Sequence, residues 1–317
     1  MQRQPISIHQ CIATLQGMEQ LLLAAVILMS GCTTSSHATK PSALGTSRDM
    51  AALEASLAQP GIVELETVAS ADWQIDRSGL INLAHPEARA AGLEEGLEPI
   101  QIFFHVIRHP TKGTFIVDTG METALRDDPS KSALGSVVRS AMRMDLLKVN
   151  APLGEFVAKE GRLDGVLLTH LHLDHVAGMR DVPSTTPIYA GPGETSGTGF
   201  MNLFTRGSID AALAGKQSIS EWPFTEGHDV VDVFGDGSVW ALWIPGHTKG
   251  STAYVVRTTT GAVLLTGDGS HTRWGWEHAV EPGTFTADLE QSRLSFERLQ
   301  KFSKANPDVE VRLGHQR

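Results

Sequence analysis

The sequence predicts an α/β sandwich in which helices lie outside two β-sheets. Three observations lead to this fold class. Strand-like apolar runs occur in pairs joined by short turns, helical patterns separate two such strand series, and the same alternation recurs in both halves of the chain. The chain has 317 residues and is 41% hydrophobic, which is enough for one large domain or two smaller ones with a real core.

The first half begins with a helical pattern over residues 48–58, which ends at Gln59-Pro60-Gly61. The runs "IQIFFHVIRH" and "GTFIVDTG" flank the turn at residues 110–113 and are typical of a β-hairpin. Helical patterns follow near 121–147 and 152–161. The next run, "LDGVLLTH", is continuously apolar, which predicts a buried strand.

The second half repeats this order with a new strand series. The runs "VWALWIPG", "STAYVVRT" and "GAVLLTGDG" are predicted strands, and Thr259-Thr260-Gly261 is a predicted turn between the last two. A final helix is expected over about 286–305, before the short strand in "VEVRLGH". No internal repeat is apparent.

The N-terminal stretch "LLLAAVILMSGC" at residues 21–32 contains nine consecutive apolar residues. This run is too short to span a bilayer as a helix, but its length fits the apolar region of a signal peptide. Ser30 and Gly31 before Cys32 resemble the lipobox of bacterial lipoproteins. That resemblance implies that residues 1–31 are a lipoprotein signal peptide and that Cys32 is acylated. The chain would then face the periplasm from a membrane of the bacterial cell envelope. The alternatives are a buried N-terminal helix and, because Glu19 stands where positive charge is expected, a start at Met18.

Composition limits the remaining organisation. The small polar residues 33–47 predict a flexible tether, so residues 32–60 are expected to form the tether and a short helix, and residues 61–317 the globular domain. Cys11 and Cys32 are the only cysteines, so a metal site in the domain must use His, Asp and Glu. The formal charge of -10 argues against nucleic acid as a partner, because nucleic acid requires a basic face.

The stretch "VLLTHLHLDHVAG" at residues 166–178 holds the strongest functional signal. His170 and His172 follow the predicted buried strand, and alternate residues of an extended segment point the same way. Asp174 and His175 come where the chain should turn into a helix, so they can approach the same point from another side. Neutral imidazole and carboxylate are the ligands that divalent ions prefer, zinc above all. The stretch therefore predicts a metal site.

Three further candidates each follow a strand and a glycine: His247, Asp268 and His315. Any one of them alone is as well explained by an ordinary loop residue. Together with the HxHxDH stretch, they extend the predicted metal site.

The segments "FIVDTG", "THLHLDH", "PGHTKGS", "TGDG" and "LGH" occur in the order of the metallo-β-lactamase superfamily motifs, over about residues 100–315. The resemblance implies a four-layer αββα sandwich with the metal site at one edge between the sheets. It also implies two ions. The first would bind to His170, His172 and His247, the second to Asp174, His175 and His315, and Asp268 would bridge them. Asp118 would support the ligand loops through hydrogen bonds.

Two zinc ions are the expected cofactors, although manganese, iron and cobalt also suit this donor set. Ions that share a hydroxide predict hydrolysis. The runs "PGHTKGSTAYVV" and "TGDGSH" are similar to N-acyl-homoserine lactonases, so the expected substrate is a lactone or related ester. The alternatives are a β-lactamase, a phosphotriester hydrolase, and a metal-binding lipoprotein that is not an enzyme.

The chain departs from the lactonases at two places. They commonly carry a tyrosine three residues after the bridging aspartate, where this chain has His271. Asp174 and His271 are the catalytic candidates, and His271 is either a proton donor to the leaving alkoxide or a surface residue. His315 stands two residues from the end of the sequence, so fraying is expected to loosen the second ion.

The apolar-aromatic segments 199–208 and 271–278 are expected loops that could line an acyl-chain groove. The alternative is that Phe200, Phe204, Trp274 and Trp276 pack in the core. Arg206 and Arg273 could contact an anionic group of the substrate or form ordinary salt bridges.

Overall fold

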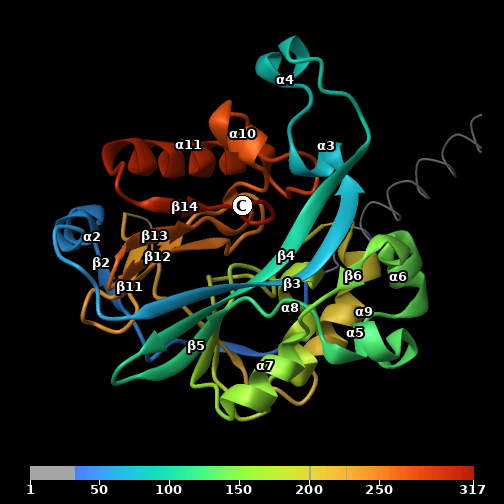
Figure 1. Ribbon diagram of the computed structural model, residues 1–317, viewed down its shortest axis with the longest axis horizontal. Helices are drawn as coiled ribbons and strands as arrows, with labels where there is room; N and C mark the ends of the chain where they lie inside the picture. Colours follow the sequence, from blue (N-terminus) through green and yellow to red (C-terminus); the bar gives the residue numbers. More distant parts are fainter. Residues whose placement is uncertain (1–32, 200, 226) are drawn as a thin grey trace, which may run out of the picture.

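The computed structural model describes residues 33–199, 201–225 and 227–317. Two mixed sheets pack face to face, and helices cover the outer face of each sheet (Figure 1). The predicted α/β fold class, a four-layer αββα sandwich, is therefore confirmed.

The first sheet has eight strands in the order β1-β9-β8-β7-β5-β4-β3-β6. The strands β3, β4 and β5 are antiparallel neighbours, whereas β5, β7, β8 and β9 run parallel. The predicted hairpin is therefore confirmed as β4–β5. The strands are β1 (Thr39–Pro41), β3 (Glu64–Asp76), β4 (Leu97–His109), β5 (Gly113–Val117), β6 (Lys148–Val149), β7 (Gly165–Leu167), β8 (Ile188–Ala190) and β9 (Ile219–Glu221).

The second sheet has six strands in the order β14-β13-β12-β11-β10-β2. Its neighbours are antiparallel except for β13 and β14, which run parallel. The predicted strand series of the second half is confirmed here as β11 to β14. The strands are β2 (Thr46–Arg48), β10 (Val230–Asp232), β11 (Val239–Trp243), β12 (Thr252–Thr258), β13 (Gly261–Leu265) and β14 (Glu310–Arg312).

The helices divide between the two outer faces according to the core residues that they supply. On the first sheet lie α5 (Thr123–Asp127), α6 (Ser136–Ala141), α7 (Leu153–Glu160), α8 (Leu173–Val176) and α9 (Asn202–Leu213). On the second lie α2 (Met50–Ser56), α10 (Arg273–Glu277) and α11 (Leu289–Ala305). The β3–β4 connection holds α3 (Arg77–Leu80) and α4 (Pro86–Ala90). Short 3-10 turns are η1 (Pro129–Lys131), η2 (Met144–Leu146), η3 (Ala177–Asp181) and η4 (Gly267–Gly269).

Three apolar clusters hold these four layers together. One lies between each sheet and its helices, and the third lies between the sheets. The middle cluster joins Val117 and Leu167 of the first sheet to Ala241 and Val256 of the second. Strand β7 is apolar along its whole length and β12 is apolar over residues 253–256, as expected for strands buried on both faces, and this explains why both were predictable from sequence.

Residues 33–47 do not form the predicted tether. Strand β1 pairs in parallel with β9, and β2 pairs with β10, so this segment lies along one edge of each sheet. Both strands are exposed and polar. An edge strand is held by backbone hydrogen bonds, which composition does not reveal, and the tether prediction is wrong for this reason.

Two other elements differ from the expectation. The 13-residue strand β3 was not predicted, because it is largely polar and only half-buried. Segment 199–208 was expected to be a loop, but most of it is the first part of α9. The first part of α9 includes the weak helix formers Thr205 and Gly207, and the helix is stabilised by packing on the first sheet through Ile209, Ala212 and Leu213.

Candidate metal centre

The HxHxDH stretch is positioned by strand β7 and a single helical turn. His170 follows the buried end of β7, and His172 is the residue before the first turn of α8. Asp174 and His175 lie within that turn, so the chain reverses around one point. His170 and His175 are buried, whereas His172 and Asp174 are partly exposed. The open side of the centre is therefore the side of His172 and Asp174.

The other three predicted ligands reach the same point from the second sheet. His247 follows β11, Asp268 lies in η4 after β13, and His315 follows β14. Gly267 has a φ of 51°, a left-handed conformation that favours glycine. An added Cβ at Gly314 would lie 2.5 Å from Asp268 Oδ1. These two glycines allow the backbone to approach the carboxylate closely.

The seven side chains form two clusters that share Asp268. The first cluster is His170, His172, His247 and Asp268, and the second cluster is Asp174, His175, His315 and Asp268. Within each cluster, the candidate ligand atoms lie within 4.8 Å of one another. Asp268 Oδ2 is 3.3 Å from His247 Nε2, whereas Asp268 Oδ1 is 3.3 Å from both His175 Nε2 and His315 Nε2. One carboxylate thus turns one oxygen to each cluster.

The hydrogen-bonding state of these atoms fits metal ions. His170 Nε2, His175 Nε2 and Asp268 Oδ1 are buried and have no hydrogen-bond partner. Buried polar atoms are nearly always paired, so three unpaired atoms facing one space need an explanation. His247 Nε2 also lies 2.9 Å from His172 Nδ1, two nitrogens that can both direct lone pairs at one ion. The donor set suits zinc and related divalent ions.

Asp118 makes the contacts expected of a residue that supports the ligand loops. Its Oδ1 accepts from the backbone N–H of Thr169 at 2.8 Å, and its Oδ2 lies 2.7 Å from His175 Nδ1. A carboxylate at that position holds the proton on Nδ1 and leaves Nε2 of His175 to face the second cluster. Asp118 has a φ of 57°, which aspartate tolerates better than most residues do.

Glu194 is a buried carboxylate that the sequence reasoning missed. Its Oε2 accepts from the backbone N–H of Leu171 at 3.0 Å, and its Oε1 accepts from the backbone N–H of Gly250 at 2.7 Å and from the Thr248 hydroxyl. It therefore ties the loop of His170 and His172 to the loop of His247. Burial raises the pKa of Glu194 to about 7. A single glutamate in "PGETSG" carries no motif signal.

The imidazoles of the first cluster favour the neutral form. Burial lowers the pKa of His172 to about 3, and it also lowers the pKa of His247 and, by a large amount, that of His170. These rings have lone pairs available at neutral pH.

The second cluster behaves in the opposite way. Burial alone would lower the pKa of His175, but Asp268, Asp118 and Asp174 outweigh burial and hold the pKa well above its usual range. The pKa of His315 is also raised, since Asp268 and Asp174 together outweigh the effect of burial. These two rings therefore tend to hold protons when no ion is bound.

His271 is buried in the wall of the centre, so the surface interpretation is wrong. Its Nδ1 lies 3.0 Å from the carbonyl oxygen of Leu80 and must donate, because a carbonyl only accepts. Its Nε2 lies 3.2 Å from Asp268 Oδ2. The ring also stacks on His315, with centroids 5.6 Å apart. Nε2 is thus the only ring nitrogen of His271 that faces the centre, and it can carry or release a proton there.

The last residues of the chain are held against β4, which differs from the predicted fraying. His315 Nδ1 lies 3.1 Å from the carbonyl oxygen of Gln101, and the Gln101 N–H donates to the His315 carbonyl oxygen at 2.9 Å. Gln316 donates to the Pro99 carbonyl oxygen at 3.0 Å. His315 is therefore oriented by a neighbouring strand, not by the free end.

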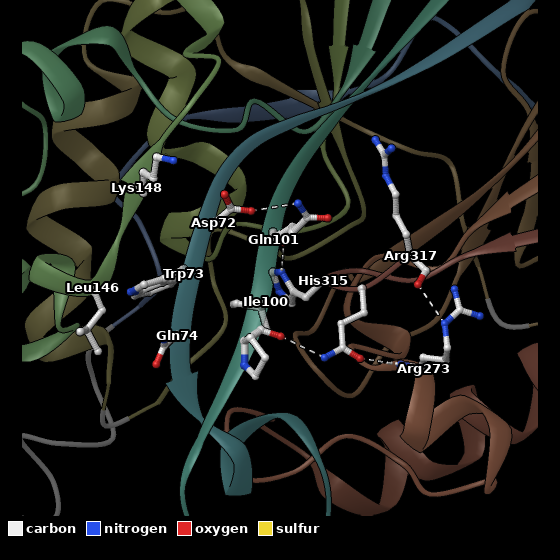
Figure 2. A pocket seen from close by; sticks show the side chains of 12 residues that line it. Asp72, Trp73, Gln74, Ile100, Gln101, Leu146, Lys148, Arg273, His315 and Arg317 are labelled. Atoms are coloured by element: carbon white, nitrogen blue, oxygen red, sulfur yellow. Dashed lines mark hydrogen bonds between the residues drawn. The ribbon is translucent and has the colours of Figure 1, made fainter.

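A cavity of about 640 Å³ opens beside His315, between the β3–β4 strands and the last residues of the chain (Figure 2). Trp73, Ile100 and Leu146 supply apolar atoms to its lining. Its charged side chains are Asp72, Lys148, Arg273 and Arg317. Three cations therefore face one carboxylate, so the net charge of these side chains is positive.

The segments expected to line an acyl-chain groove contribute little to this cavity. Only Arg273 comes from segment 271–278, and no described residue of segment 199–208 lines it. Trp274 and Trp276 pack against the apolar clusters, as the alternative interpretation held. Phe204 is exposed, and Phe200 lies outside the described residues. Arg206 pairs with Asp210 at 3.6 Å, and Arg273 with Glu277 at 3.7 Å.

Comparisons with known proteins agree with this geometry. The family described as the metallo-beta-lactamase superfamily matches residues 97–315. N-acyl homoserine lactonase AttM of Agrobacterium fabrum is 30% identical over 153 residues, which are 47% of this chain and 57% of that protein. The AttM lactonase of Azorhizobium caulinodans is 28% identical over 230 residues, which are 68% of this chain and 82% of that protein.

The fold is also similar to a solved crystal structure of a quorum-quenching N-acyl homoserine lactone lactonase. The TM-score is 0.59 at 20% sequence identity, and the match covers 81% of this chain and 94% of that one. At this identity the likeness concerns the fold.

Proposed function

Because the chain belongs to the metallo-β-lactamase superfamily, a superfamily of hydrolases, we propose that it is a metal-dependent lactonase that opens an N-acyl-homoserine lactone or a closely related ester. The observation that carries this proposal is the pair of clusters sharing Asp268, with buried ligand atoms that have no other partner. The similarity to relatives named as lactonases supports the substrate class.

The seven cluster residues would hold two zinc ions, one in each cluster. When bound, such ions lower the pKa of a shared water and polarise the carbonyl oxygen of the substrate. Asp268 orients both clusters through its two oxygens. Asp118 and Glu194 hold the ligand loops in place from behind.

His271 is proposed to move the proton of the reaction. In its neutral form, Nδ1 donates to the Leu80 carbonyl and Nε2 offers a lone pair to the centre. Nε2 can take the proton that the attacking water releases and return it to the ring oxygen that leaves as an alkoxide. The lactone C–O bond breaks, the water oxygen joins the carbonyl carbon, and the product is a hydroxy acid. Asp174, at the open side of the centre, would position the second ion and the water.

A β-lactamase is the second candidate, and the cavity beside His315 favours it. Lys148, Arg273 and Arg317 line this cavity, and β-lactam antibiotics carry a carboxylate that such cations attract. An N-acyl-homoserine lactone has no charged group to use them.

The test measures proton release by the purified full-length chain in detergent, with a panel of N-acyl-homoserine lactones and a β-lactam, and metal content in the same samples. The proposal expects rapid, chelator-sensitive lactone opening with about two ions per chain. His170→Ala and His247→Ala should abolish it, while Arg206→Ala, a change outside the centre, should not. Preference for the β-lactam, lost in a Lys148→Ala and Arg273→Ala double variant, would establish the second candidate. Bound metal without turnover of any ester or lactam would indicate a metal-binding protein and contradict both.

We further propose that residues 1–31 are a lipoprotein signal peptide and that acylated Cys32 attaches the chain to a membrane of the bacterial cell envelope, facing the periplasm. The lipobox-like residues before Cys32 support this. Within the described residues, no helix is long and apolar enough to cross a membrane. The test compares membrane and soluble fractions of cells that express the wild type or Cys32→Ser, together with the mass of the N-terminal peptide. An unmodified Cys32 peptide would contradict it.

A further inference from the structure

The first described residues are fixed to the body of the protein close to α9. Thr33 forms an antiparallel bridge with Thr198, and the Thr34 N–H donates to the Gly197 carbonyl oxygen at 2.9 Å. Ser36 donates from its backbone N–H and its hydroxyl to the Asp210 carboxylate on α9, at 2.8 and 2.7 Å. The chain is therefore held against the folded domain from Thr33 onward, without a flexible linker.

Beside this attachment, α9 presents large apolar side chains to solvent. Met201 is 60% exposed, Leu203 45% and Phe204 50%. The buried face of the helix begins only at Ser208, so the first turn projects beyond the core. We call Met201, Leu203 and Phe204 the apolar turn. Grouped apolar side chains of this size are unfavourable in water and typical of an interaction surface.

The place of Cys32 in the sequence, directly before Thr33, indicates what covers the apolar turn. Cys32 directly precedes Thr33, Thr33 pairs with Thr198, and Met201 follows Thr198 by three residues. Consecutive Cα atoms are about 3.8 Å apart and bridged strands about 5 Å apart, so the Cα atoms of Thr33 and Met201 are separated by roughly 17 Å at most. An acyl chain on Cys32 and the apolar turn would thus reach the same bilayer surface.

Two cationic residues lie near this surface. Lys249 is exposed, and its Nζ lies 3.5 Å from the hydroxyl of Ser196, two residues before Thr198. Arg206 lies on α9, one turn beyond the apolar turn, where it also pairs with Asp210. Cationic side chains beside an apolar surface suit the phosphate layer of a membrane.

We propose that the apolar turn inserts into the phospholipid bilayer to which Cys32 is attached. The inference rests on the proposed acylation of Cys32 and is independent of the proposed lactone hydrolysis. The domain would then be held in one orientation on the membrane instead of swinging on a tether. Helix α8, which carries Asp174 and His175, packs beside α9, so the candidate metal centre would keep a constant position above the lipid.

The chain offers a matched control for the test. Leu294 on α11 is 46% exposed, nearly the same as Leu203, but α11 covers the second sheet, on the opposite outer face (Figure 1). The photoreactive residue benzoylphenylalanine replaces either leucine in the full-length chain, expressed in bacteria whose phospholipids carry radiolabelled phosphate. After illumination of isolated envelopes, phosphate label on the purified chain is measured. Acylation of Cys32 adds no phosphate, so it does not contribute to the signal.

We expect several-fold more phospholipid label from position 203 than from position 294, and position 201 should repeat the result of position 203. Equal labelling of 203 and 294 would overturn the inference, as would a protein adduct at 203 with twice the mass of the chain, which would indicate a second copy. Lactone opening by the same preparations in detergent shows that the variants fold. Lipid labelling without lactone opening would count against the proposed function alone.

Discussion

The two candidate metal clusters share Asp268 and use the same ligand types, but the charge around their imidazoles differs. Burial dominates in the first cluster and keeps His170, His172 and His247 neutral. In the second cluster, Asp268, Asp118 and Asp174 raise the pKa of His175 despite burial, and Asp268 and Asp174 raise that of His315. An imidazole is therefore ready to bind an ion in one cluster, whereas an ion must displace protons in the other.

The largest expected effect comes from the residue that the clusters share. Asp268→Asn removes the negative charge that faces both, so we expect metal content to fall below one ion per chain. Activity should fall by more than the roughly 10–100-fold that loss of an outer hydrogen-bond partner costs. Elemental analysis and lactone opening measure these effects. Asp232→Asn, at a buried aspartate outside the centre, is the control. If Asp268→Asn retained two ions per chain, the claim that both clusters depend on Asp268 would be wrong.

The next effect separates the clusters. His247→Ala should remove the ion of the first cluster, and His315→Ala should remove that of the second, each leaving about one ion per chain. Titration with zinc against a competing chelator measures both sites. If either variant loses both ions to the same extent, the clusters bind as one unit and the distinction between them fails.

Asp118→Asn sharpens the comparison, because Asp118 contacts His175 directly and reaches His170 only through Thr169. Asparagine tolerates the positive φ of this position, so the backbone should be retained. We expect the metal affinity of the second cluster to fall roughly 10–100-fold and that of the first to fall less. The same chelator competition reports this, and equal losses at both sites would argue against it.

Proton release tests the difference in charge directly. The raised pKa of His175 and His315 means that these rings are protonated in the metal-free chain below their folded pKa. Ion binding to the second cluster should therefore release protons at about pH 6.5, whereas binding to the first should release almost none. Release should decrease as the pH rises through the raised pKa. Calorimetry in two buffers of different ionisation enthalpy measures the protons, and equal release at both steps would contradict the comparison.

The smallest effect concerns Glu194, which holds the loops of the first cluster. Its pKa is raised to about 7, so the wild type should lose stability as the pH rises from the ordinary glutamate value to 7, since only the unfolded chain ionises freely over that range. Glu194→Gln should remove the contribution of Glu194 to this slope and cost about 1–3 kcal/mol, because an amide cannot accept all the hydrogen bonds. Urea unfolding of the metal-free chain at several pH values measures both effects. Glu122→Gln, at a second buried glutamate whose pKa burial also raises, is the comparison and should remove only its own contribution to the slope. An unchanged slope in Glu194→Gln would exclude this role.

The sequence was most informative where a local pattern has a direct physical cause. Strand β7 is apolar throughout and β12 is apolar over residues 253–256 because both strands are buried on both faces. Helix α11 shows the helical spacing of a helix with one buried face. The ligand motif was readable because His170 and His172 alternate along an extended segment and the chain then turns sharply at α8. Glycine before His247, Asp268 and His315 also marks places where the backbone approaches closely.

Contacts between segments that are distant in sequence could not be predicted from such local patterns. Residues 33–48 have the composition of a tether and form two edge strands, because backbone hydrogen bonds to β9 and β10 do not depend on their side chains. The role of Glu194 could be recognised only from the structure, because the Leu171 and Gly250 N–H groups that donate to it are distant in sequence. The place of His271 in the wall of the centre depends on its hydrogen bond to the Leu80 carbonyl oxygen, which is 191 residues away in sequence.

The sequence by itself therefore determined the layers of the fold and the types of ligand. Burial and side-chain direction produce periodic patterns of apolar and polar residues that can be recognised in neighbouring positions. The tertiary structure alone decided which imidazoles hold protons, which buried carboxylate ties the ligand loops together, and where the chain after Cys32 meets the body. These properties depend on the distance between charges and on the pairing of edge strands, and both are set by residues far apart in the chain.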